Sequence, residues 1–215
     1  MGQRVLVLED DPFTRVSVVA ALRHFGFEVV VEEDLPGPAL EKAQVARPDV
    51  AVLDLHLGKG PTGLDVAIGL RRQFPRIGLV FLTSYDDPRL LNPSLPAVPQ
   101  GSVYLTKQSV SNLNSLRQAV LDSVDEKRMT SLSEVGHVYG NMTDVQVETL
   151  RLVAMGLSNS EIAKRRFVKV KSVEVTISRI AKLLGIAVDS SVNQRVHIAR
   201  VYFRSIGVKI DATAD

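Results

Sequence analysis

Five short, continuously apolar runs divide the first part of the chain at regular intervals, and no other feature limits the possible folds as much. Runs that are apolar throughout, rather than alternating, are typical of parallel strands covered on both faces. Helix-length segments separate them, and 12–25 and 109–122 carry apolar residues at helical spacing. The sequence therefore predicts an α/β fold with a doubly wound, five-stranded parallel sheet and a ligand site at the carboxyl ends of the strands. The runs are "RVLVL" (4–8), "FEVVV" (27–31), "VAVLDL" (50–55), "GLVFL" (78–82) and "SVYLT" (102–106).

The connection between the fourth and fifth runs breaks this pattern. The stretch "SYDDPRLLNPSLPAVPQG" contains Pro88, Pro93, Pro96 and Pro99. Because a proline inside a helix costs about 3 kcal/mol, a regular fourth helix is not expected there. We expect a loop, or at most one or two helical turns.

Charge divides the chain into two parts. Residues 1–123 carry 12 Lys/Arg against 14 Asp/Glu, whereas residues 143–207 carry 11 against 5. The polar stretch between them lacks a clear periodicity. We therefore predict a first domain at 1–123, a linker at 124–141 and a basic second domain at 142–207.

The second domain has the signals of four helices and no strands. Thr143 with Gln146, and Ser158 with Glu161, are capping-box pairs that begin two helices. A tight turn between the second and third helices is typical of a helix-turn-helix. The later helices are expected at 159–167, 171–184 and 190–205.

The last of these helices has an apolar stripe. Its members are Val192, Val196, Ala199, Phe203 and Ile206. A stripe of this kind either pairs with a second copy of the chain or packs within its own domain, and the sequence leaves both open.

Polar residues gather where four of the five apolar runs end. In a doubly wound sheet these ends converge on one crevice. Clustered carboxylates, with one hydroxyl and one lysine, suit a hard divalent cation such as Mg²⁺, which relieves the repulsion between the acids. The residues are Glu9, Asp10, Asp11, Asp54, Thr83 and Lys107.

One of the three adjacent acids has a different expected role. Asp11 precedes Pro12, and these are the residue types favoured at the N-cap and first position of a helix. We therefore expect Asp11 to begin a helix, and Glu9 and Asp10 to serve the cation.

Taken together, residues 4–122 resemble the receiver domain of bacterial two-component response regulators, which has a flavodoxin-like fold. The resemblance implies that Asp54 accepts a phosphoryl group from the phosphohistidine of a partner sensor histidine kinase. It implies that Mg²⁺ is held by Glu9, Asp10, Asp54 and the backbone carbonyl of His56.

The same resemblance assigns the remaining pocket residues. Thr83 would donate a hydrogen bond to the phosphate, Lys107 would pair with it, and Tyr104 would be the aromatic switch that rotates inward. The chain departs from the family at Gly58 and Gln108, which stand where prolines are usual. Its loop "GKGPTG" is also one residue longer, and the proline-rich stretch replaces the usual fourth helix of the output face.

The basic domain resembles the DNA-binding domain of NarL/LuxR-type (FixJ-like) regulators. The match lies in "LRLVAMGLSNSEIA" followed by "SVEVTISRIAKLLG", within 142–186. It implies that 171–184 is a recognition helix in the major groove of double-stranded DNA, that the last helix is a dimerisation surface, and that the active protein is a homodimer. The expected DNA-binding residues are Lys169, Lys171, Ser172, Glu174, Val175, Ser178, Arg179 and Lys182.

This domain also departs from its family. Arg166 stands at an apolar position, where we expect Phe167 to take over the packing, and Lys169 replaces the usual Ser/Thr cap of the recognition helix. Loss of such a cap costs about 1 kcal/mol. Thr176 stands where histidine is common.

These observations favour a phosphorylated transcription regulator that is not an enzyme. One alternative is a phosphorylation-independent DNA binder whose receiver serves only as a dimerisation or interaction module. A second, a flavodoxin-like hydrolase or nucleotide enzyme, lacks support because "EDDPFT" occupies the place of a glycine-rich phosphate loop.

No apolar run approaches the length of a membrane span, and the N-terminus has no secretory pattern. We therefore expect a cytoplasmic protein without a membrane partner. The chain has no cysteine, which excludes disulfides and thiolate metal sites.

Overall fold

The computed structural model describes residues 2–108, 113–125, 137–186 and 193–208. The chain forms two compact units. The N-terminal unit comprises Met1–Ser84 and Pro96–Glu134, and the C-terminal unit comprises Tyr85–Leu95 and Val135–Asp215.

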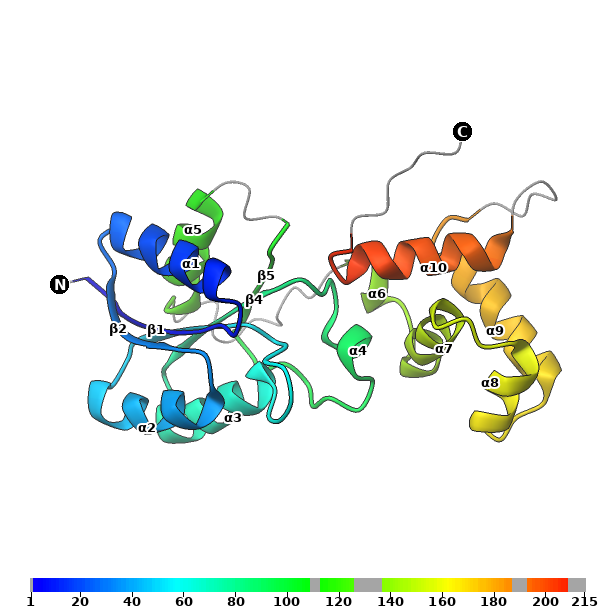
Figure 1. The fold of residues 1–215 in the computed structure, drawn as a ribbon, viewed down its shortest axis with the longest axis horizontal. Coiled ribbons are helices and arrows are strands. Elements are labelled where there is room, and N and C mark those ends of the chain that lie inside the picture. Colours follow the sequence, from blue (N-terminus) through cyan, green and yellow to red (C-terminus); the bar gives the residue numbers. More distant parts are fainter. Residues whose placement is uncertain (1, 109–112, 126–136, 187–192, 209–215) are drawn as a thin grey trace. The chain divides into compact units, whose positions relative to one another are not determined.

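A five-stranded parallel sheet is the centre of the N-terminal unit (Figure 1). The strand order is β2-β1-β3-β4-β5, the order of a doubly wound flavodoxin-like fold. This confirms the predicted fold class, because each apolar run forms one strand. The strands are β1 (Arg4–Leu8), β2 (Glu28–Glu33), β3 (Val50–Leu53), β4 (Gly78–Thr83) and β5 (Val103–Thr106).

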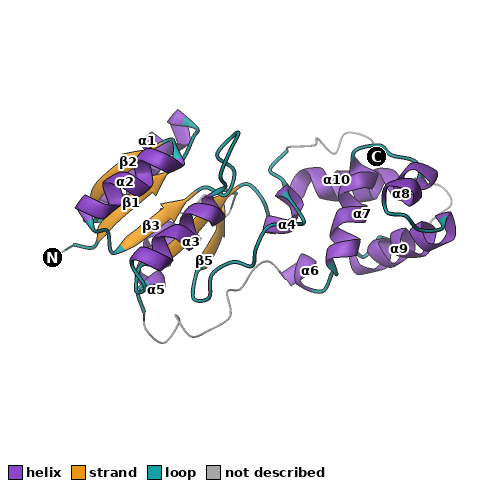
Figure 2. Ribbon diagram, turned by 90° about the horizontal axis from the view of Figure 1, so that it is seen from below, coloured by secondary structure: helices purple, strands orange, loops and turns teal. Residues whose placement is uncertain are grey.

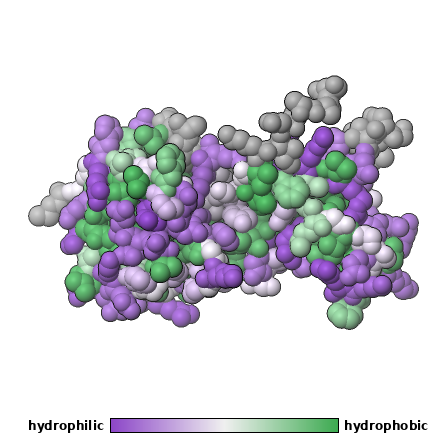
Figure 3. All heavy atoms as spheres, in the orientation of Figure 1, coloured by the Kyte–Doolittle hydropathy of each residue, from purple (hydrophilic) through white to green (hydrophobic). Residues whose placement is uncertain are grey.

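Helices cover both faces of this sheet, which explains why the central strands β3 and β4 are almost entirely apolar, whereas the edge strand β2 carries three glutamates. The helices α1 (Pro12–His24) and α5 (Leu113–Ser123) lie on one face, and α2 (Pro36–Ala46) and α3 (Gly63–Gln73) lie on the other (Figures 1 and 2). All residues of β3 and β4 are buried. On the face of this unit seen in Figure 3, hydrophobic side chains are scattered among hydrophilic ones.

The connection between β4 and β5 contains the single turn α4 (Pro88–Leu91), as the prolines predict. Its N-cap, Asp87, accepts a hydrogen bond from the backbone N–H of Arg89. This segment belongs to the C-terminal unit, where α4 packs on α7 (Asp144–Ala154). A contiguous division at 1–123, 124–141 and 142–207 does not anticipate this assignment, and those domain borders stay a prediction.

Among the described residues of the C-terminal unit, the regular secondary structure is helical. Thr143 and Gln146 form the predicted capping box at the start of α7, and Ser158 caps α8. The four predicted helices are confirmed, and the short α6 falls within the predicted linker. The remaining helices are α6 (His137–Gly140), α8 (Asn159–Arg165), α9 (Val170–Leu183) and α10 (Gln194–Ser205).

The face of α10 that enters the core differs from the predicted stripe. The buried residues are Ile198, Tyr202 and Ser205, spaced as one face of a helix, whereas Val196 is 47% exposed. Phe203 and Ile206 pack only at the edge of the core, and Val192 lies outside the described residues.

The expectation that Phe167 replaces the apolar residue at position 166 is wrong. Phe167 is 95% exposed and has a left-handed backbone, with φ of 53°. The Arg166 guanidinium instead donates a hydrogen bond of 2.8 Å to Thr149 Oγ1, and the Thr149 side chain is fully buried. A polar pair therefore replaces apolar packing between α7 and the end of α8. Within the described ranges, no helix is both long and apolar enough to cross a membrane.

Candidate functional site

The carboxyl ends of three strands bring an ammonium group between two buried carboxylates. Glu9 follows β1, Asp54 follows β3 and Lys107 follows β5. Lys107 Nζ lies 2.8 Å from a Glu9 carboxylate oxygen and 2.8 Å from Asp54 Oδ2. The predicted convergence of these strand ends is therefore present in the fold.

Three carboxylates of this pocket are arranged as a group that could hold a metal ion. Glu9, Asp10 and Asp54 each offer an oxygen atom, and these atoms lie within 4.8 Å of one another. Glu9 and Asp54 are buried, at 2% and 6% exposure, whereas Asp10 is exposed. An all-oxygen donor set that is open on one side suits a hard divalent cation.

The charges in this pocket perturb one another. Burial raises the pKa of Glu9, the hydrogen bond from Lys107 opposes this, and the nearby Asp54 raises the pKa again, so that the result is a pKa of about 7. Burial also lowers the pKa of Lys107, but the two carboxylates outweigh it and leave that pKa above its ordinary value. The pocket has more negative than positive groups, and a bound cation would relieve that imbalance.

The third acid of the sequence cluster has the expected separate role. Asp11 is the N-cap of α1, and its Oδ1 accepts a hydrogen bond of 2.7 Å from the Thr14 backbone N–H. This contact lowers the pKa of Asp11. The Arg15 guanidinium, one turn further on, donates to the backbone carbonyl of Glu9 at 2.7 Å. The start of α1 thus fixes the backbone that carries the pocket acids.

The other expected pocket residues lie on strands β4 and β5 or just after β3. The His56 backbone N–H donates to Asp54 Oδ1 at 3.3 Å. Thr83, the last residue of β4, is fully buried, and its carbonyl accepts a hydrogen bond from the Lys107 backbone N–H at 2.7 Å. On β5, the half-buried Tyr104 ring lies 6.1 Å from the Phe81 ring, between centroids.

A further residue of this site, Gly63, was not predicted from the sequence. A Cβ atom at Gly63 would lie 1.8 Å from the backbone carbonyl oxygen of Asp54, closer than any real contact. The Gly63 backbone N–H also donates to the Leu55 carbonyl at 3.0 Å. Only glycine permits α3 to begin this close to Asp54. The available signal was the glycine that ends "GKGPTG", directly before the apolar face of a helix.

The candidate nucleic-acid surface lies on α9. One face of the helix packs in the core through Val173, Ile177, Ile180 and Ala181. The residues expected to contact DNA are all exposed, in contrast to this buried face. They are Lys169, Lys171, Ser172, Glu174, Val175, Ser178, Arg179 and Lys182.

Two contacts on α9 limit what these residues can offer a ligand. Lys171 forms an ion pair of 3.3 Å with Glu174, and Ser178 Oγ donates to the Glu174 carbonyl at 3.0 Å. Lys169 occupies the N-cap position without a side-chain hydrogen bond to the helix, as expected from its replacement of Ser/Thr.

Comparison with known proteins agrees with this architecture. Residues 5–120 match the family described as "Response regulator receiver domain". The response regulator protein VraR of Staphylococcus saprophyticus is 26% identical over 193 residues, covering 86% of this chain and 92% of its own length. VraR of Staphylococcus aureus strain Mu3 is 25% identical over the same share of both chains.

Solved structures with a similar fold span nearly the whole chain. A structure of two RcsB dimers bound to two parallel DNAs has a TM-score of 0.60 and 20% identity, covering 96% of this chain and all of that one. A complex of the two-component response regulator RcsB with DNA has a TM-score of 0.54 and 20% identity, covering 95% and 100%. Since the family match includes more than half of the residues and the strand-end pocket lies within it, the chain belongs to the response regulator receiver domain family.

Proposed function

We propose that this protein is a two-component response regulator that is phosphorylated on Asp54 and binds DNA through α9. The observation that carries the proposal is the pocket in which Lys107 lies 2.8 Å from both a Glu9 oxygen and Asp54 Oδ2. The exposed polar face of α9, in a helical unit with a helix-turn-helix order of elements, supports the output function. The protein then acts as a regulator rather than an enzyme.

Phosphoryl transfer requires a nucleophile, positive charge to neutralise the phosphoryl group, and access of the phosphodonor to the pocket. The donor set of Glu9, Asp10 and Asp54 fits Mg²⁺, which when bound would neutralise charge on the transferred group. An Asp54 oxygen forms the new bond to phosphorus as the bond from phosphorus to the kinase's histidine nitrogen breaks. Lys107 can then pair with a phosphoryl oxygen instead of a carboxylate.

Residues at and beside the end of β4 could respond to the added phosphoryl group. The Thr83 hydroxyl would donate to the phosphoryl group, and Tyr104, on the adjacent strand, would follow its movement. The His56 backbone carbonyl is proposed as a further Mg²⁺ ligand. The other proposed partners are a sensor histidine kinase, double-stranded DNA and a second copy of this chain, in the cytoplasm.

Incubation with Mg²⁺ and a small phosphodonor tests the proposal directly. We expect the intact mass to rise by one phosphoryl group and DNA affinity to rise with it, and Asp54→Asn to abolish both. Asp49→Asn, an exposed aspartate that accepts a hydrogen bond from the Arg4 backbone, is the matched control. Normal DNA binding without any Asp54-dependent change would instead favour the phosphorylation-independent regulator.

A pair of adjacent substitutions tests the assignment of the metal ligands. Asp10→Asn should abolish most Mg²⁺ binding, whereas Asp11→Asn should leave it intact because Asp11 caps α1. Titration with Mg²⁺, followed by NMR of the pocket residues, measures both affinities. Equal losses in the two variants would contradict the assignment.

A salt series tests the DNA-binding face. If Lys171 contacts a phosphate, Lys171→Ala should weaken binding to all sequences alike and reduce the slope of log K against log salt by about 1. Arg4, an exposed residue of the N-terminal unit, gives the control substitution Arg4→Ala, which should leave the slope unchanged.

A further inference from the structure

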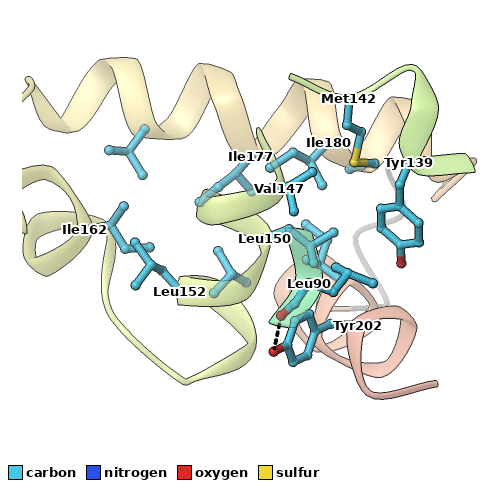
Figure 4. Packing of buried hydrophobic residues seen from close by; sticks show 14 of the residues in the cluster. Leu90, Tyr139, Met142, Val147, Leu150, Leu152, Ile162, Ile177, Ile180 and Tyr202 are labelled. Atoms are coloured by element: carbon cyan, nitrogen blue, oxygen red, sulfur yellow. Dashed lines mark hydrogen bonds between the residues drawn. The ribbon is translucent and has the colours of Figure 1, made fainter. Parts of the chain in front are cut away.

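The segment Tyr85–Leu95 lies in the receiver part of the sequence and yet contributes to the core of the C-terminal unit. Leu90 is 1% exposed and belongs to the same buried cluster as Leu150 and Tyr202 (Figure 4). Its backbone carbonyl accepts a hydrogen bond of 3.5 Å from the Tyr202 hydroxyl. The helical unit thus takes one of its core side chains from a segment that precedes it by dozens of residues.

Arg89 uses every donor of its guanidinium within this unit. Nε and Nη2 both donate to Asp87, and Nη2 also donates to the Tyr139 carbonyl. Nη1 donates to the Met142 carbonyl and to Asp144. Five bonds match the five N–H groups that an arginine possesses. The distances, from 2.6 to 3.1 Å, are those of good hydrogen bonds. Such a group is fully satisfied where it lies.

The contacts of Asp87 stabilise the packed position of the segment. It is 2% exposed, pairs with Arg89 and caps α4. Separation of Arg89 from α6 and α7 would break its hydrogen bonds to the Met142 and Tyr139 carbonyls, of which the Tyr139 carbonyl also accepts from the Met142 backbone N–H at 2.9 Å. On the other side of the segment, the Asp86 backbone N–H donates to the Ser205 carbonyl at 2.8 Å, and the Tyr139 hydroxyl donates to Ser205 Oγ at 2.6 Å. The segment is therefore tied to both ends of the described C-terminal unit.

We propose that Tyr85–Leu95 is a permanent structural part of the DNA-binding unit, which couples that unit directly to the end of β4. The chain passes between the units after Ser84, after Leu95 and after Glu134. Only Ser84 separates Thr83, the proposed phosphate partner, from the first residue of the segment. Movement at Thr83 therefore reaches the DNA-binding unit through one intervening residue, with no docking or release of a separate output face. This signalling role rests on the proposed function, whereas the structural membership of the segment does not.

Hydrogen exchange of the full chain tests the structural membership. Leu90→Ala removes the buried side chain, and Leu91→Ala is the matched control because Leu91 is only partly buried and lies in neither described core cluster. We expect Leu90→Ala to accelerate exchange in α7 and α10 by about tenfold or more, and to leave β1 and β3 unchanged. Faster exchange in the sheet alone, or equal effects of the two substitutions, would overturn the proposal.

A disulfide tests whether the segment stays in place when the protein responds to phosphorylation. The contact between Asp86 N and Ser205 O keeps the two Cα atoms within about 7 Å, the range that a disulfide can bridge. The variant Asp86→Cys with Ser205→Cys gives a single specific crosslink, since the chain has no other cysteine.

We expect the oxidised variant to gain DNA affinity with phosphodonor to the same extent as its reduced form. Loss of that gain on oxidation, restored by a reductant, would identify the segment as a releasable latch and overturn permanence, as would failure of the crosslink to form. Wild-type protein in the same oxidant is the control. If wild-type protein itself shows no gain, the proposed function fails, and the exchange experiment still decides the membership of the segment.

Discussion

Each unit contains a partly buried cation between acids, Lys107 in one and Arg89 in the other, and the two clusters differ in the balance of their charges and hydrogen bonds. In the N-terminal unit, Lys107 faces Glu9 and Asp54, with Asp10 close by. In the C-terminal unit, Arg89 faces Asp87 and Asp144 and also reaches two backbone carbonyls. An ammonium is a compact point charge, whereas a guanidinium is a planar fork that fixes its partners.

The difference appears in the protonation equilibria. In the first arrangement the acids outnumber the cation, and the pKa of Glu9 is raised to about 7. In the second, the hydrogen bond to Asp87 raises the pKa of Arg89 above its ordinary value, despite burial. An excess of negative charge favours the binding of an exchangeable cation. An arginine whose N–H groups are all hydrogen-bonded instead links the segments that it contacts. The same chemical components thus suit the proposed binding role in one unit and a structural role in the other.

The largest expected effect comes from the backbone beneath the first arrangement. Gly63→Ala forces a Cβ into the Asp54 carbonyl, and we expect it to destabilise the N-terminal unit by about 3 kcal/mol or more. Gly37→Ala, where nothing lies within 4 Å of the added Cβ, should cost little. Urea unfolding of both variants measures the difference. Similar stabilities would show that the pocket does not depend on this close approach.

The second effect is a pH dependence of stability, which we expect from the Lys107 cluster and not from the Arg89 cluster. Between pH 4.5 and about 7 the folded state keeps a proton on Glu9 that the unfolded state has released. Without metal, the free energy of unfolding contributed by Glu9 therefore falls as pH rises through this window, by no more than about 3 kcal/mol. The stability difference between wild type and Glu9→Gln, measured by urea unfolding at several pH values, should follow this trend. The exposed Glu28→Gln is the control, and a flat difference for Glu9→Gln would contradict the prediction.

A charge-conserving substitution tests the Arg89 cluster. Arg89→Lys keeps the positive charge but offers three N–H groups in place of five, so at least two of the five hydrogen bonds of Arg89 are lost. We expect a loss of about 2 kcal/mol in the stability of the C-terminal unit. Thermal unfolding followed by circular dichroism measures it, with the exposed Arg72→Lys as the control. An unchanged melting temperature would mean that charge alone, and not geometry, holds the segment.

The smallest expected effect is a gain in stability outside either cluster. Lys169→Ser supplies the missing cap of α9 and should stabilise the C-terminal unit by about 1 kcal/mol. The same substitution should lower DNA affinity, because it removes a cation from the proposed DNA-binding face. Chemical unfolding and a binding titration on one sample measure both changes. If stability rises while affinity is unchanged, Lys169 does not contact DNA.

The sequence predicts most of the N-terminal unit because its central strands are buried on both faces. Such strands stay apolar throughout, as "VAVLDL" and "GLVFL" do, so their ends also locate the pocket residues. The starts of α7 and α8 were equally predictable. Thr143 and Ser158 accept hydrogen bonds from backbone N–H groups that have no partner within the first turn of a helix.

What escaped prediction depends on contacts between distant residues. Four prolines exclude a long helix between β4 and β5, but they do not indicate that Leu90 packs against residues after position 139. The partners of Arg89 lie as much as 55 residues away along the chain. Gly63 is likewise required by the Asp54 carbonyl rather than by its own neighbours, and the exposure of Phe167 depends on the Arg166–Thr149 pair.

The place of Leu90 also affects the order in which the chain can fold during synthesis. Its partner Tyr202 is 112 residues further on. At roughly 5–20 residues per second, a ribosome needs on the order of 6–20 seconds to make that intervening length. For this interval the nascent chain carries Leu90 without its partner Tyr202, in the connection between β4 and β5. Chaperones that recognise short apolar segments would therefore meet the protein at α4, before its DNA-binding half exists.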